Sequence, residues 1–128
     1  MTQRLTPAQK DKLALELIEL LQKEGAFEEC VIYTNNKAYS PDSFNNLSET
    51  KAQTSLGSYF VVPFSNDKVK LKDEYANTET LTMTFEGILY DMIYNDMGIC
   101  DKLNKLFKKY HMYYEQGYSW SFSCYFIN

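Results

Sequence analysis

The stretch YSWSFSCYF, residues 118–126, alternates large side chains with serine almost without interruption. Successive side chains of a β-strand point to opposite faces, so this alternation predicts a strand with one buried face. That face would carry Tyr118, Trp120, Phe122, Cys124 and Phe126. Burial stabilises a fold by about 1.5–3 kcal/mol for each large apolar side chain, so exposing the row as a ligand platform would be costly. We therefore expect the aromatic row to face the core.

Two registers are compatible with the C-terminal hairpin that ends in this strand. A two-residue turn at 116–117 would pair Tyr113 with Trp120 and place His111 opposite Phe122. A three-residue loop with Gly117 as a left-handed bulge would instead pair Met112 with Trp120, and Tyr114 with Tyr118. We favour the bulge, because it requires a positive φ only at a glycine and places Met112 with the aromatic row.

The N-terminal part of the chain predicts an amphipathic helix. Thr6, Pro7 and Gln9 have the residue types of a capping box with proline at the first helical position, and Gly25 follows the predicted end. At helical spacing one arc of about 160° carries only apolar side chains. These are Leu13, Ala14, Leu17, Ile18, Leu20 and Leu21. We expect this arc to pack on an apolar part of the core, although such an arc could also bind a partner.

Several short segments have the composition of strands. Two flank a turn at 35–36, and three more are expected at 58–64, 67–75 and 80–86, where β-branched or alternating residues recur. In the last of these, Leu81, Met83 and Phe85 should face inward. The polar, turn-rich residues 41–57 predict a loop with at most one helical turn.

After Gly87 the apolar period becomes helical. Ile88, Leu89, Met92 and Ile93 fit one helix, and a second is expected from about Cys100 to Tyr110. The predicted fold class is therefore α+β, with an N-terminal helix, an antiparallel sheet of about five to seven short strands, and two helices inserted before a C-terminal β-hairpin. A chain of 128 residues is the usual size of one core, so we expect a single domain over residues 1–128.

Composition argues against several chemistries. Three cysteines at 30, 100 and 124 match no paired metal-ligand spacing, and the only histidine, His111, follows a predicted helix end without a nucleophile at diagnostic spacing. The five glycines are dispersed, which excludes a phosphate-binding loop of known pattern. Residues 48–51 fit a bare S-x-x-K pattern but lack its companion motifs. We expect no metal, no cofactor and no enzymatic activity.

The expected setting is reducing and cytoplasmic. No apolar segment follows the polar N-terminus, and no run reaches the 18 apolar residues that a membrane span needs, so we predict no membrane association. The net charge of −4 gives no general attraction to nucleic acid or anionic lipid, and Arg4 is the only arginine.

Tyrosine is the most informative feature of the composition, with 11 residues. Tyrosine offers a large contact area with a polar tip and is enriched at protein interfaces. The predicted helix and hairpin leave an outward set, which we take as partner-binding: Tyr90, Asp91, Tyr94, Tyr113 and Tyr125. An AT-rich genome would produce the same excess of tyrosine with no functional meaning, and the sequence favours neither explanation.

The first functional prediction is a non-catalytic protein-binding accessory protein. Its small size and composition suit a gene of a phage, plasmid or conjugative element, for which inhibition of a host defence system, of the anti-restriction or anti-CRISPR type, would be a natural role. The partner would be another protein of unknown identity, and the oligomeric state is left open.

Two alternatives use other residues. A nucleic-acid-binding module would use a basic helical stripe with nearby tyrosines, although an ordinary solvated surface also explains that stripe. Its members are Lys102, Lys105, Lys108 and Lys109. A small enzyme would use a carboxylate group around the central helices, and would need a cleft holding at least two of its members. These are Glu86, Asp91, Asp96 and Asp101.

Overall fold

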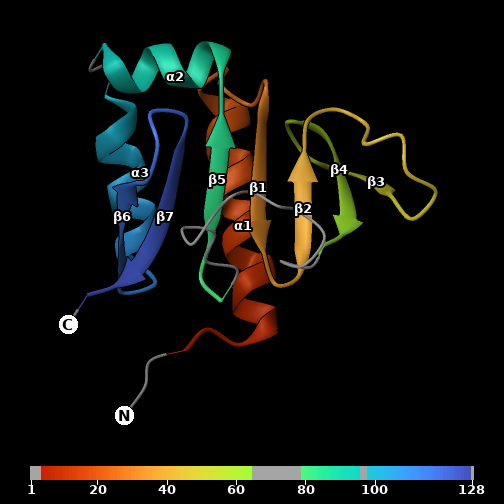
Figure 1. Cartoon of the computed structure of the whole chain (residues 1–128), viewed down its shortest axis with the longest axis horizontal. Helices are drawn as coiled ribbons and strands as arrows, with labels where there is room; N and C mark the ends of the chain where they lie inside the picture. Colours follow the sequence, from red (N-terminus) through yellow and green to blue (C-terminus); the bar gives the residue numbers. More distant parts are fainter. Residues whose placement is uncertain (1–3, 65–78, 96–97, 128) are drawn as a thin grey trace.

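The computed structural model describes residues 4–64, 79–95 and 98–127 (Figure 1). Within them, three helices and a seven-stranded antiparallel sheet confirm the predicted α+β class. The helices are α1 (Pro7–Lys23), α2 (Gly87–Tyr94) and α3 (Ile99–Lys108). The strands are β1 (Cys30–Thr34), β2 (Lys37–Ser40), β3 (Thr50–Thr54), β4 (Gly57–Pro63), β5 (Thr82–Phe85), β6 (Met112–Gln116) and β7 (Ser121–Phe126). The sheet order is β3-β4-β2-β1-β5-β7-β6.

Helix α1 begins at the predicted capping box. The backbone N–H of Gln9 donates to Thr6 Oγ1 at 3.1 Å, and the Gln9 side chain accepts from the backbone N–H of Thr6 at 2.8 Å. Pro7 occupies the first turn, where its missing N–H costs nothing. The predicted apolar arc is buried at five of its six positions, and Leu20 is half-buried. The helix therefore lies along the sheet with its apolar arc inward.

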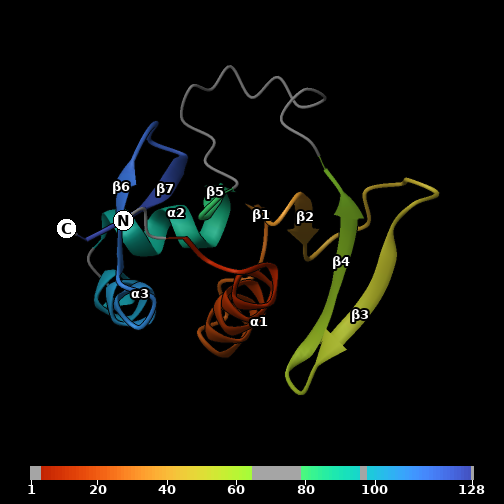
Figure 2. The same cartoon turned by 90° about the horizontal axis from the view of Figure 1, so that it is seen from below.

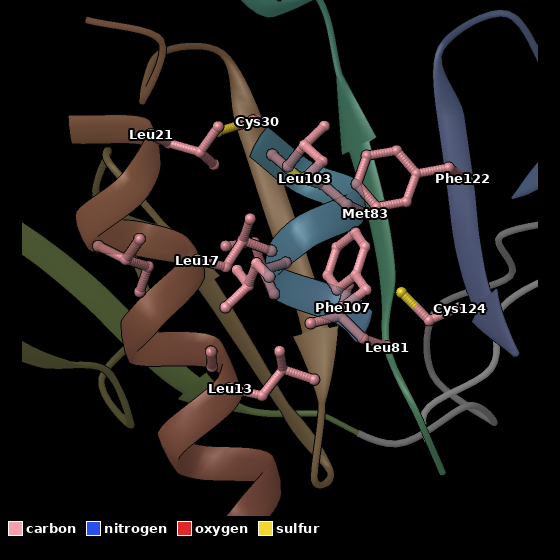
Figure 3. Packing of buried hydrophobic residues seen from close by; sticks show 14 of the residues in the cluster. Leu13, Leu17, Leu21, Cys30, Leu81, Met83, Leu103, Phe107, Phe122 and Cys124 are labelled. Atoms are coloured by element: carbon pink, nitrogen blue, oxygen red, sulfur yellow. The ribbon is translucent and has the colours of Figure 1, made fainter. Parts of the chain in front are cut away.

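The main core fills the space between the sheet and the helices α1 and α3, which lie on the same side of the sheet (Figure 2). Leu13, Leu17 and Leu21 reach into it from α1, and Phe107 reaches into it from α3 (Figure 3). The ring of Phe122 in β7 lies 5.8 Å from that of Phe107. As predicted, the inward residues of β5 are buried, and Leu81 just before the strand is buried with them.

The turn between β1 and β2 forms where two asparagines predicted it. Asn35 and Asn36 have φ angles of 54° and 56°, a left-handed conformation that asparagine tolerates better than most residues. Pro63 ends β4, within the strand expected at 58–64. The strand predicted over 67–75 lies outside the described residues.

The prediction that residues 41–57 form a loop was wrong for their second half. Thr50–Thr54 form β3, whose five residues all pair with β4, from Thr50 opposite Val61 to Thr54 opposite Gly57. The sequence TKAQT has neither an apolar run nor alternation. Its extended backbone follows from the partner strand, whose unpaired edge offers a ladder of donors and acceptors.

Both predicted registers of the C-terminal hairpin were wrong. Met112 pairs with Phe126 and Tyr114 pairs with Cys124, which leaves residues 117–120 as a longer connecting loop. The prediction that Met112 and Tyr114 lie on the same sheet face as the aromatic row was right, because they pair with Phe126 and Cys124 and share a face with Phe122. The strand is displaced toward its C-terminus because Phe122 pairs with Met83 of β5.

The prediction that the whole aromatic row is buried therefore holds for only part of it. Phe122 and Cys124 are fully buried and Phe126 is half-buried, whereas Tyr118 and Trp120 are each 38% exposed. These two residues lie before β7, in the loop that joins it to β6. Ile88 belongs to the apolar set of the predicted second helix, but it is 40% exposed, and Leu89 is the buried residue of α2.

Candidate functional site

Four large aromatic side chains gather at the end of the molecule where α2 crosses the sheet. Tyr90 and Tyr94 come from α2, and Tyr118 and Trp120 come from the loop between β6 and β7, which ends beside α2 (Figure 1). Each is between 36% and 47% exposed. We call these four residues the aromatic end surface.

The two halves of the aromatic end surface are joined by hydrogen bonds. The hydroxyl of Tyr94 donates to the backbone carbonyl of Ser119 at 3.0 Å, and Gln116 Nε2 donates to the same hydroxyl at 2.8 Å. Tyr90 and Tyr94 pack with their ring centroids 4.5 Å apart. Helix α2 and the loop are thus held in one arrangement.

The loop that carries Trp120 is fixed by its own backbone bonds. The N–H of Gly117 donates to the carbonyl of Ser121, and the N–H of Phe85 donates to the carbonyl of Trp120 at 2.8 Å. The rings of Tyr118 and Trp120 stack with centroids 4.9 Å apart and an interplanar angle of 7°. A surface ordered before binding loses little conformational entropy on contact with a partner.

The predicted partner-binding tyrosines lie on two separate surfaces. Tyr90, Asp91 and Tyr94 are exposed together on α2. Tyr113 and Tyr125 pair across β6 and β7 with ring centroids 5.9 Å apart. Their neighbour Tyr114 packs on Phe107 of α3, so by strand alternation this pair lies on the sheet face away from α3.

Two of the four lysines of the predicted basic stripe form ion pairs with α1. Lys102 Nζ lies 2.5 Å from Glu24 Oε1, and Lys109 pairs with Glu16. Burial alone would raise the pKa of Glu16, but hydrogen bonds from Lys109 and Tyr110 outweigh it and lower that pKa. Lys105 and Lys108 are exposed and take part in no ion pair of the described residues. The stripe therefore presents less free charge than its sequence suggests.

The predicted carboxylate group does not converge on one cleft in the described structure. Glu86 precedes α2 and lines a hollow of about 460 Å³, but neither Asp91 nor Asp101 lines it. Asp96 lies outside the described residues. Within the described chain, no group of three or more histidine, cysteine or acidic residues is arranged to hold a metal ion.

Sequence reasoning missed Tyr118 and Trp120, which it assigned to the core. The signal that could have identified them is the uncertain length of the loop after Gln116, because a four-residue loop removes both rings from the strand. Neighbouring Gly117 and Ser119 are residue types common in such loops.

Comparison with known proteins yields no relative. No protein-family model matches the chain, and neither a curated protein nor a solved structure matches it significantly. Among the described residues, none of the helices combines the length and apolar composition needed to cross a membrane.

Proposed function

We propose that this chain is a non-catalytic protein-binding protein whose aromatic end surface contacts the partner. The observation that carries the proposal is the exposure of Trp120 stacked on Tyr118, beside Tyr90 and Tyr94, in a loop held by hydrogen bonds. Tryptophan and tyrosine dominate the energetics of protein interfaces, where a few central aromatic residues supply most of the binding free energy.

The arrangement is unusual for a surface that faces only water. Isolated exposed rings are common, but neighbouring rings that leave apolar area in contact with solvent are typical of binding sites. A partner that covered this end would remove several large side chains from water at once.

The biological setting belongs to the proposal as well. We infer a cytoplasmic protein, in keeping with three free cysteines, of which two are buried. The small acidic chain suits an accessory gene of a phage, plasmid or conjugative element, and its partner would be a component of a host defence system. This assignment stays a prediction, and the identity of the captured partner tests it.

Nucleic-acid binding through the lysine stripe is the weaker candidate. Lys102 and Lys109 already face carboxylates of α1, which leaves Lys105 and Lys108 as its unpaired members. Phosphate contacts weaken linearly with salt on a logarithmic plot, so gel shifts with single- and double-stranded oligonucleotides at several salt concentrations test this candidate. Absence of a shift at low salt would exclude it.

Affinity capture tests the proposed surface directly. The full chain is immobilised, a bacterial lysate is passed over it, and the retained protein is identified by mass spectrometry and then purified. We expect Trp120→Ala to weaken binding of the purified partner by about 30-fold or more, as truncation of a hot-spot residue does. Tyr90→Ala should weaken it to a smaller extent.

Tyr113→Ala is the matched control, because Tyr113 is 39% exposed and Trp120 is 38% exposed, on different surfaces. The control should leave affinity within about threefold. If Tyr113→Ala abolished binding while Trp120→Ala did not, the partner would use the tyrosine pair on the outer sheet face. A chain that captured no protein and remained monomeric would contradict the protein-binding function itself.

A further inference from the structure

A hollow of about 460 Å³ adjoins the aromatic end surface. Trp120 forms part of its wall, together with the ends of β1, β2 and β5. The acidic side chains among its described lining residues are Glu29, Asp42 and Glu86, and none of the described lining residues is basic. One ring of the aromatic end surface, that of Trp120, therefore lies beside a negatively charged depression.

None of the three carboxylates of the hollow takes part in an ion pair of the described residues. All three side chains are exposed, and the ion pairs of the described residues use Asp11, Glu16 and Glu24 instead. Three negative charges around one hollow attract a cation that enters it.

The position of Glu29 is fixed by the fold. Its backbone takes the left-handed conformation, with φ of 49°, and its carbonyl accepts from the N–H of Glu86 at 2.9 Å. Its carboxylate lies against Gly87, where an added Cβ would be 3.1 Å from Glu29 Cδ. The backbones of Glu29 and Glu86, two of the three acidic residues of the hollow, are thus hydrogen-bonded at the start of α2.

We propose that the aromatic end surface binds a basic segment of its protein partner, with an arginine or lysine side chain seated in the hollow beside Trp120. This inference rests on the proposed function, since the exposed rings define the docking surface and the charge selects the partner. A cation over an indole face is attracted by the ring electrons, and carboxylates around it add Coulomb attraction. Arginine fits best, because its planar guanidinium stacks on rings and donates to carboxylates in pairs.

Trp120 is the only tryptophan of the chain, so its fluorescence reports on this position alone. The probe is the peptide acetyl-Gly-Arg-Gly-Arg-Gly-amide, titrated into the full chain at low salt. The same peptide with citrulline replaces each guanidinium by a neutral group of similar shape, and a glutamate peptide reverses the charge. We expect the arginine peptide to change the fluorescence of Trp120 in a saturable way. Its half-saturating concentration should be at least tenfold lower than that of the citrulline peptide, and the glutamate peptide should leave the fluorescence unchanged.

Two variants with the same net charge distinguish the effect of the carboxylates in the hollow from the effect of the overall charge on peptide binding. Glu29→Gln, Asp42→Asn and Glu86→Gln combined should raise the half-saturating concentration of the arginine peptide at least tenfold. Glu19→Gln, Asp101→Asn and Glu115→Gln combined remove the same three charges from outside the hollow and should change it less than threefold. Circular dichroism melts confirm that both variants fold. Equal effects of the two variants, or equal binding of the citrulline peptide, would overturn the inference.

The captured partner distinguishes this inference from the function on which it rests. If Trp120→Ala releases the partner and the triple variant of the hollow keeps it with unchanged affinity, the partner is not held by a basic segment, and the protein-binding function stands. If Trp120→Ala keeps the partner, the aromatic end surface is not the docking site. Loss of the partner from both variants supports the inference.

Discussion

Trp120 and Phe122 have neighbouring places in the chain and opposite environments. The ring of Phe122 lies within 5.8 Å of the rings of Phe85 and Phe107 and 4.9 Å from that of Tyr114. The ring of Trp120 stacks on that of Tyr118, lines the acidic hollow and is 38% exposed. The first residue therefore contributes to stability, and the second is available for recognition.

Substitution of these two residues should separate folding from binding. Phe122→Ala should lower the free energy of unfolding by about 3–5 kcal/mol, because it removes a buried ring and leaves a cavity. Trp120→Ala should lower it by less than about 1 kcal/mol, as expected of a surface position. Urea denaturation followed by circular dichroism measures both. Equal losses would mean that Trp120 is part of the core.

The cysteines should differ in reactivity in the same way. Burial raises the pKa of Cys30 to about 12, with a further contribution from the negative charge of Asp42, and burial also raises the pKa of Cys124. Both therefore remain protonated thiols at pH 8, and only the thiolate reacts. In the native protein, iodoacetamide should modify the half-buried Cys100 first, as peptide mass spectrometry can show. Rapid modification of Cys30 without denaturant would contradict this assignment.

Helix α1 is tied to the β1–β2 hairpin through one carboxylate. Asp11 Oδ1 accepts hydrogen bonds from Asn35 Nδ2, Lys37 Nζ and Tyr39 Oη at 2.9, 3.0 and 3.1 Å. Burial alone would raise the pKa of Asp11, but these three bonds and the charge of Lys37 outweigh it and lower that pKa below its usual range. A carboxyl group with a lowered pKa stabilises the fold in its charged form.

The effect of Asp11 on stability should depend on pH. The contribution of the charged group is fully present above its unfolded pKa and is lost as pH falls through the lower folded pKa. Asp11→Asn should therefore lower the free energy of unfolding at pH 7, and the difference from the natural chain should shrink below about pH 4. Glu19→Asn, on the exposed side of the same helix, is the control. A difference that stayed constant down to pH 2 would disprove the ionic contribution.

The start of α2 depends on a glycine. Gly87 has φ of 61°, and a Cβ there would lie 3.1 Å from Glu29 Cδ, whereas Gly25 has φ of 70° with nothing within 4 Å. Alanine at either position should lower the free energy of unfolding by about 1–2 kcal/mol, because a residue with a Cβ is strained in the left-handed conformation. Gly87→Ala should cost more than Gly25→Ala in thermal or urea unfolding, because Glu29 must also move. Equal costs would show that the carboxylate moves freely.

The molecule as a whole has a compact helix-covered part and an extended sheet edge. Strands β3 and β4 continue the sheet beyond α1 (Figure 2), and no residue of β3 is fully buried. Strands β1 and β5 lie in the centre, under the core. Regions with few buried apolar contacts open at a lower free energy than the centre of a fold.

Hydrogen exchange should reveal this difference. Backbone amides of β3 that pair with β4 should exchange at least tenfold faster than those of β1 and β5 at neutral pH, because the edge opens without unfolding the core. Mass spectrometry of peptic fragments gives the rates. Uniform protection of the seven strands would show instead that the sheet opens as one unit.

Elements with strong local patterns could be predicted from the chain. The capping residues and apolar arc of α1, the two asparagines after β1 and the alternation before Gly87 each have one favourable local conformation. Strand β3 lacks such a pattern and exists only through its pairing with β4. The tyrosines of α2 were placed on its surface from helical spacing, whereas Trp120 was not found.

The alternation within residues 118–126 determined which alternate side chains of β7 face the helices, since successive side chains of a strand point to opposite faces. The residue at which β7 begins depended on its pairing with another strand, β5. Phe85 is the last residue of β5, and its N–H donates to the carbonyl of Trp120 before the chain turns into α2 at Gly87, so the ladder between β5 and β7 ends at this point. Trp120 consequently lies in a loop beside Glu29, Asp42 and Glu86, residues brought to it from three separate parts of the chain.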